Sequence, residues 1–274
     1  MDKLHPSSAR PRSVFYSLSI LAIGSSLLAQ PLAAINLSEA ESQRIGRKVW
    51  QNECNGTVAG LTSWNEGEDF ASLGIGHFIW YPEGRRGPFD ESFPTLLGFV
   101  AARGAKLPAS LQAGSELHCP WKSRSAFLAA QKSGEMKELR QFLVSTINLQ
   151  AQFLAERLQN ALPKMLAETA PANRARVEQQ FQRVAGSPSG RYALIDYVNF
   201  KGEGVLSTER YNGQGWGLLQ ALEEMETGGS DAAKEFSRAA AAILTRRVHN
   251  APGGRNEAKW LPGWLNRVRG YTRG

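Results

Sequence analysis

Residues 50–82 constrain the fold more than any other part of the sequence. They read WQNECNGTVAGLTSWNEGEDFASLGIGHFIWYP and pass from a helical pattern into a glycine-punctuated loop and then a short apolar run. Upstream, Ser38 is followed three residues later by Glu41, a capping-box pattern that indicates a helix start. We therefore predict a helix that ends near Glu53, followed by a small β-hairpin over residues 57–82.

The rest of the chain has a mostly helical pattern. Residues 83–120 are rich in Gly, Pro and Phe, and we expect loops and short helices there. Further helices are predicted at 123–132, 135–147, 148–161, 172–184, 190–200, 214–226 and 231–248, with Pro and Gly punctuating them. The tail, with Trp260 and Trp264, is expected to dock on the body. The sequence thus predicts a predominantly helical α+β fold, a single domain over residues 35–274 with a small β-hairpin near its start.

The first 34 residues have the composition of an export signal. Lys3, Arg10 and Arg12 form a basic start, residues 15–28 are apolar, and small residues lead to a cleavage point at Ala34. We predict a signal peptide over 1–34 and a periplasmic or secreted protein. The alternative is an uncleaved N-terminal anchor, since the apolar run is almost long enough to span a bilayer.

The chain is basic. Its formal net charge is +7, and removal of the first 34 residues, with three basic side chains and one acidic, leaves +5. Basicity favours acidic partners such as nucleic acid, anionic membranes or acidic polymers. Because Lys and Arg are dispersed and no nucleic-acid module is recognisable, we expect an anionic cell-wall polymer and no nucleic acid. An ordinary solvated surface is the alternative.

Two cysteines, Cys54 and Cys119, lie in the exported part. In an oxidising compartment an even number of cysteines favours one disulfide. Two buried free thiols are the alternative. Neither cysteine is expected to be a nucleophile, because no Cys–His pairing is legible in the sequence.

Glu53 and Glu66 are expected to be carboxylates in different environments. The partial negative charge at a helix C-terminus and the neighbouring Trp50 both disfavour ionisation of Glu53, so that it can hold a proton. Glu66, on a wetter loop between Asn65 and Gly67, is expected to be ionised. Glycosidic bond cleavage requires one proton donor and one carboxylate that activates water or stabilises an oxocarbenium-like transition state.

The same region resembles the active site of phage-type lysozymes in the lysozyme-like superfamily. Five residues separate Glu66 from the SLGIGH run at 72–77, as they separate an acidic residue from a T-x-G-x-G-H-like strand in that family. The resemblance implies a lysozyme-like fold, with Glu53 as general acid, Glu66 as second carboxylate and Ser72 orienting water. Glu in place of Asp, Ser in place of Thr, and a longer interval after Glu53 depart from the family pattern.

Further residues are candidates for substrate binding. Glu68, or Asp69 beside it, can replace Glu66 as second carboxylate. The remaining candidates are His77 on the predicted strand, Asn199 at a helix end, and Tyr211 and Gln214 in an aromatic, glycine-rich loop suited to sugar rings. Each also has a structural alternative: His77 as a hydrogen-bonded histidine, Asn199 as part of a helix C-cap, and Tyr211 and Gln214 as part of a helix start. The scattered histidines show no metal-ligand spacing, so neither a metal nor a cofactor is expected.

These observations lead to the hypothesis of an exported, monomeric glycosidase, a lysozyme-like muramidase that cleaves peptidoglycan or a chitin-like amino-sugar polymer. Two alternatives remain open. A lytic transglycosylase can use Glu53 alone, with the sugar's own 6-hydroxyl as nucleophile. A non-catalytic glycan-binding protein can retain the same fold.

Overall fold

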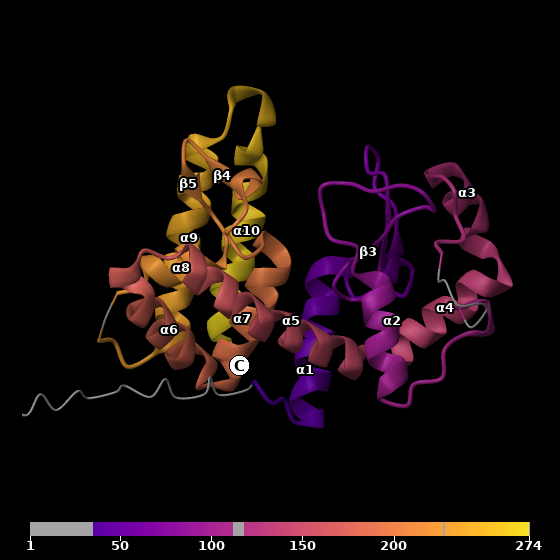
Figure 1. Ribbon diagram of the computed structural model, residues 1–274, viewed down its shortest axis with the longest axis horizontal. Helices are drawn as coiled ribbons and strands as arrows, with labels where there is room; N and C mark the ends of the chain where they lie inside the picture. The colour runs from indigo at the N-terminus through magenta and orange to yellow at the C-terminus, as the bar shows by residue number, and fades with distance from the viewer. Residues whose placement is uncertain (1–34, 112–117, 227, 274) are drawn as a thin grey trace, which may run out of the picture. The chain divides into compact units, whose positions relative to one another are not determined.

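The computed structural model describes residues 35–111, 118–226 and 228–273 (Figure 1). The predicted signal peptide lies outside these residues. The first helix, α1 (Glu39–Cys54), begins and ends where the sequence predicts. The Ser38 hydroxyl accepts a hydrogen bond from the Glu41 backbone N–H at 3.2 Å, and Asn55, with φ of 53°, closes the helix.

The segment after α1 forms a three-stranded antiparallel sheet in the order β1-β2-β3, where a two-stranded hairpin was expected. Its strands are β1 (Thr62–Ser63), β2 (Ala71–Leu73) and β3 (Phe78–Trp80). The prediction of one strand over residues 72–77 is wrong beyond Leu73. Gly74 (φ +73°) and His77 (φ +50°) take left-handed conformations that turn the chain back into β3.

The remaining helices follow the predicted order. They are α2 (Phe93–Ala102), α3 (Arg124–Ala129), α4 (Gly134–Ser145), α5 (Ile147–Glu168), α6 (Pro171–Ala185), α7 (Pro188–Lys201), α8 (Leu218–Glu224), α9 (Ala232–Asn250) and α10 (Leu261–Arg269). Short 3-10 turns join several of them.

Two segments differ from the prediction. Helix α5 continues past Pro163 to Glu168, because the helix buries Leu162 and Met165 on either side of the proline. The helix predicted from residue 214 begins only at Leu218. A small hairpin precedes it, formed by β4 (Arg210–Tyr211) and β5 (Gln214–Gly215).

Helix α5 lies at the centre of the fold. It packs against α1, α2, α6 and α7 and so joins the helices around the small sheet to the later helical layer (Figure 1). The Arg191 side chain of α7 reaches Glu41 of α1 at 2.7 Å and ties these two helices together. The result is a predominantly helical α+β fold, and the residues from Ile35 onward belong to one compact unit. In the described part of the chain, no helix is both long and apolar enough to cross a membrane.

Cys54 and Cys119 are buried free thiols, so the expected disulfide is absent from the structure and the free-thiol alternative describes it. The two thiols face different backbone carbonyls instead of each other. Cys54 faces the Gly74 carbonyl at 3.7 Å, whereas Cys119 lies in the segment that pairs with Pro82 and faces the Trp121 carbonyl at 3.6 Å.

Candidate active site

Glu53, in the last turn of α1, is the centre of a polar cluster drawn from four parts of the chain. Its carboxylate Oε1 accepts a hydrogen bond from Arg267 Nη2 of α10 at 2.6 Å and a longer one from Asn199 Nδ2 of α7 at 3.4 Å. Oε2 lies 3.8 Å from His77 Nδ1. Among the described residues no hydrogen bond reaches Oε2. The side chain is 15% exposed, and one of its two oxygens is held by two donors.

Arg267 is shared between two carboxylates. Its Nε and Nη2 donate to the two oxygens of Asp196 at 2.7 and 2.8 Å, a bidentate pair, while Nη2 also donates to Glu53. Asp196 is fully buried and also accepts from the Tyr271 hydroxyl at 2.7 Å. Desolvation opposes the charged form of Arg267, but the attraction and hydrogen bonds of Asp196, together with Glu53 and Tyr271, raise the pKa of Arg267 well above its usual value. Arg267 is thus a fixed cation whose charge Asp196 largely balances.

The tight turn between β2 and β3 brings His77 to Glu53. Gln150 of α5 anchors this turn, since its side-chain oxygen accepts from the Ile75 backbone N–H at 2.9 Å. Gly76 lets Asn199 approach closely: a Cβ atom there would lie 2.8 Å from Phe78 Cζ and 3.2 Å from Asn199 Oδ1. The SLGIGH segment therefore serves the site mainly as a compact turn, and only its first two residues belong to β2.

A cleft of about 390 Å³ begins beside this cluster and includes His77 and Asn199 in its lining. The sheet side contributes Phe89, the helical side contributes Leu206, and Leu154 of α5 forms part of the floor. Phe89 and Leu206 are large apolar side chains that remain 56% and 52% exposed. Apolar rims around a polar interior suit sugar rings, whose faces are apolar and whose edges carry hydroxyls.

Three carboxylates line this cleft, whereas Glu53 lies beside it and is not part of its lining. Glu203 is paired with Lys164 at 3.1 Å. Glu209 accepts hydrogen bonds from the Gly204 and Leu206 backbone N–H groups, and burial raises its pKa. Asp90 is exposed. Glu209 and Asp90, as well as Arg267 and Asp196, could not be identified from the sequence, because nothing in the local pattern distinguishes them from surface or core residues.

The predicted second carboxylate stands apart from the cluster. Glu66 is exposed in the β1–β2 loop, and no contact among the described residues joins it to Glu53. Glu68 accepts from Asn65 at 3.1 Å within the same loop, and Asp69 lies 3.6 Å from Arg85. Ser72 is buried within β2. Of the residues predicted in this region, the structure brings only Glu53 and His77 together.

Tyr211 and Gln214 belong to the β4–β5 hairpin and do not line the cleft. Tyr211 packs on Trp216, with ring centroids 4.4 Å apart, and donates its hydroxyl to Glu257 at 2.9 Å. Gln214 accepts from Asn250 at 2.9 Å. The proposed sugar-stacking loop is therefore a packed hairpin whose aromatic faces are used internally.

Cys54 lies beside the cluster, with Sγ 3.6 Å from His77 Nε2, a proximity that the sequence did not suggest. Burial, reinforced by the Glu53 charge, raises the pKa of the Cys54 thiol to about 12. The thiol is therefore protonated at neutral pH and unsuited to nucleophilic attack.

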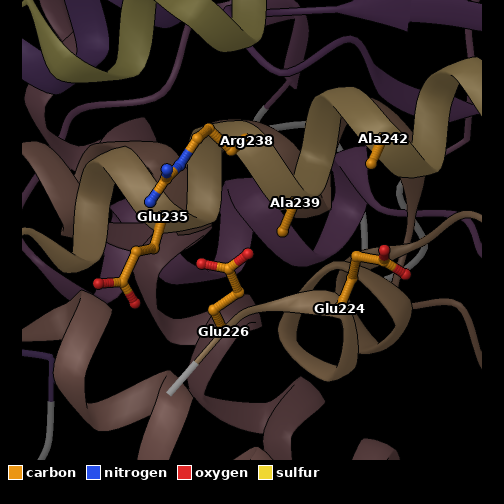
Figure 2. Close-up of a pocket in the computed structure, with 6 residues that line it drawn as sticks. All are labelled: Glu224, Glu226, Glu235, Arg238, Ala239 and Ala242. Atoms are coloured by element: carbon orange, nitrogen blue, oxygen red, sulfur yellow. The ribbon is translucent and has the colours of Figure 1, made fainter. Parts of the chain in front are cut away.

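A second, smaller pocket of about 180 Å³ lies between the end of α8 and helix α9 (Figure 2). Glu224, Glu226 and Glu235 surround it, together with Arg238. Glu224 pairs with Arg246 and Glu235 with Arg183, each at 3.0 Å. In the described ranges no group of His, Cys, Asp and Glu side chains is arranged to hold a metal ion. Glu224 and Glu235 thus act as partners of arginines, and the pocket shares no residue with the Glu53 cluster.

Comparison of the chain with protein-family models, with curated proteins and with solved structures finds no match.

Proposed function

We propose that the protein is an exported glycoside hydrolase with a lysozyme-like fold that cleaves peptidoglycan or a related amino-sugar polymer. The observation that carries this proposal is the placement of Glu53. It ends α1 beside a cleft with exposed apolar rims, one oxygen held by Arg267 and Asn199, the other without a hydrogen bond among the described residues. A carboxyl group in this arrangement can deliver a proton from Oε2 to the oxygen of a glycosidic bond.

Arg267 bears directly on this role. Arg267 donates a 2.6 Å hydrogen bond to Glu53, so the proposed general acid has a cation beside it. Here Asp196 takes both Arg267 nitrogens in a buried bidentate pair, so the net charge that Glu53 meets is much smaller. The same arginine then stabilises the carboxylate that remains after the proton has left.

The proposal allows for two cases, one with a second carboxylate and one without. Glu66, Glu68 and Asp69 share one loop, and Glu66 remains the first choice from its spacing to residues 72–77. If no second carboxylate takes part, Glu53 acts alone as acid and then base in the transglycosylase reaction, and the product carries an anhydro-sugar end.

One observation favours the non-catalytic alternative. The Glu53–Arg267 pair, together with the exposed position of Glu66, is also what a glycan-binding protein with a disused site would show. In that case the cleft binds the polymer and releases it uncut.

The deciding experiment measures new sugar ends from purified peptidoglycan with the wild type, Glu53→Gln and Glu66→Gln. Glu39→Gln, at the exposed start of α1, is the matched control and should retain full activity. We expect Glu53→Gln to reduce cleavage by at least 100-fold, on the order of the contribution of general acid catalysis. Reducing ends identify a hydrolase, and anhydro ends identify a transglycosylase. Binding without cleavage by the wild type would refute the enzymatic proposal.

A further inference from the structure

Arg157 of α5 is a cation in the cleft that the proposed chemistry does not use. It lines the cleft on the same face of α5 as Leu154 and Lys164, three residues before it and seven after it. Lys164 is committed to Glu203 at 3.1 Å. By contrast, Arg157 makes no hydrogen bond and no ion pair within the part of the chain that the structure describes.

Arg157 is an exposed side chain that lines the cleft and has no ion-pair partner among the described residues. The side chain is exposed to the cleft, yet the surrounding protein desolvates it and lowers its pKa. Glu203 and Asp90 act in the opposite direction from beyond ion-pair distance. An unpaired guanidinium of this kind gains most from a carboxylate that enters the cleft, because its planar fork can donate two parallel hydrogen bonds to one carboxylate.

We propose that Arg157 is a specificity-determining residue that binds a carboxylate carried by the substrate, so that the cleft prefers an acidic amino-sugar polymer to a neutral one. This inference deepens the proposed function and depends on the same cleft. Phe89 and Leu206 contact any pyranose face and do not discriminate, whereas Arg157 rewards only a polymer with an acidic substituent. Peptidoglycan carries carboxylates on its stem peptides, and the lactyl carboxylate of muramic acid is free wherever a stem peptide is absent. Chitin has neither.

The test compares Arg157→Gln and Arg157→Lys with the wild type on three polymers. These are intact peptidoglycan, glycan strands freed of stem peptides, whose lactyl carboxylates are exposed, and the neutral soluble polymer glycol chitin. Arg103→Gln is the matched control: Arg103 is an exposed arginine on another face, 3.4 Å from Glu156, and its loss changes net charge equally. Initial rates at low polymer concentration give kcat/KM for each combination of protein variant and polymer.

We expect Arg157→Gln to lower kcat/KM on intact peptidoglycan by about 10- to 100-fold, the size of a charge-assisted hydrogen bond. The rate on glycol chitin should change by less than about twofold. Arg157→Lys should fall between the two, since lysine keeps the charge and loses the fork. A loss on the peptide-free strands as large as that on peptidoglycan shows that Arg157 also accepts a lactyl carboxylate, and a loss confined to intact peptidoglycan assigns the carboxylates of the stem peptide. An equal loss on glycol chitin, or no loss on peptidoglycan, overturns the inference.

Binding separates this inference from the proposed function. Co-sedimentation with insoluble peptidoglycan and with insoluble chitin uses the Glu53→Gln background, in which no cleavage is expected. If the wild type cuts neither polymer but Arg157→Gln weakens binding to peptidoglycan alone, the enzymatic proposal fails and the specificity inference stands. If cleavage occurs and Arg157→Gln leaves both binding and the rate ratio unchanged, the specificity inference fails and the enzyme remains.

Discussion

Asp196 sets how strongly Arg267 acts on Glu53, and its substitution tests this at the scale of one residue. Asp196→Asn keeps the shape but removes the buried counter-charge of Arg267, so we expect a loss of about 3–5 kcal/mol in the free energy of unfolding. Glu53 would then be the only carboxylate paired with Arg267, and polymer cleavage should fall as well. Urea denaturation and the cleavage assay measure both effects.

The control for Asp196→Asn is Glu156→Gln, which breaks an ion pair whose side chains are 41% and 48% exposed. Such surface pairs contribute about 0–1 kcal/mol, so this variant should unfold almost as the wild type does. Equal, small losses in the two variants would show that Asp196 does not hold Arg267 as the structure implies.

The same residues show how far sequence alone can reach into this site. Glu53 was identifiable because a helix end and a glycine-rich turn are local patterns, and Asn199 because it ends a helix. Arg267 was not identifiable. It lies 214 residues beyond Glu53 in a tail that shows only two tryptophans and a proline, and its role depends on how α10 packs beside α7 and α9.

At the scale of the element, the turn between β2 and β3 positions the site, and Gly76→Ala tests it. The added methyl would meet Phe78 at 2.8 Å and Asn199 at 3.2 Å. Since Phe78 is fully buried, we expect a loss of about 1–3 kcal/mol in the free energy of unfolding and lower activity as Asn199 leaves Glu53. Gly98→Ala on α2 is the matched control, because its methyl meets nothing within 4 Å and should be neutral or stabilising. Identical stability and activity in Gly76→Ala and the wild type would contradict this account of the turn.

Element boundaries were predictable where capping chemistry sets them and unpredictable where packing does. Ser38 fixes the start of α1 through a side-chain hydrogen bond that the sequence reveals. Pro163 suggests a helix end, yet α5 continues because Leu162 and Met165 are buried on its inner face. Similarly, the helix predicted from residue 214 begins only at Leu218, because Asn212 and Gly213 adopt positive φ and turn the chain into the β4–β5 hairpin.

At the scale of the whole molecule, the later helices enclose three neighbouring basic side chains, Lys201, Arg247 and Arg267, which lie between the site and the β4–β5 hairpin. Lys201 is 9% exposed, and its Nζ lies 3.4 Å from the ring centroid of Trp264 and 3.8 Å from that of Phe200. Burial, with Arg247 and Arg267 nearby, lowers the pKa of Lys201 to about 6. The two rings and the carboxylates of Glu257 and Glu53 favour the charged form, but they do not offset the desolvation.

This shift predicts how the stability of the molecule depends on pH. Between pH 6 and about 10 the unfolded chain keeps the Lys201 proton and the folded protein has lost it, so the folded state gains stability as the pH rises through this window. One proton corresponds to about 1.4 kcal/mol per pH unit. Lys201→Met removes this contribution, so the free energy of unfolding of the wild type minus that of Lys201→Met should increase from pH 6 to pH 8.5. Urea denaturation at half-unit pH steps measures the difference, with the exposed Lys137→Met as control for the loss of a lysine. A difference that stays flat across this range would mean that Lys201 is charged in the folded protein and that the surrounding rings and carboxylates outweigh its burial.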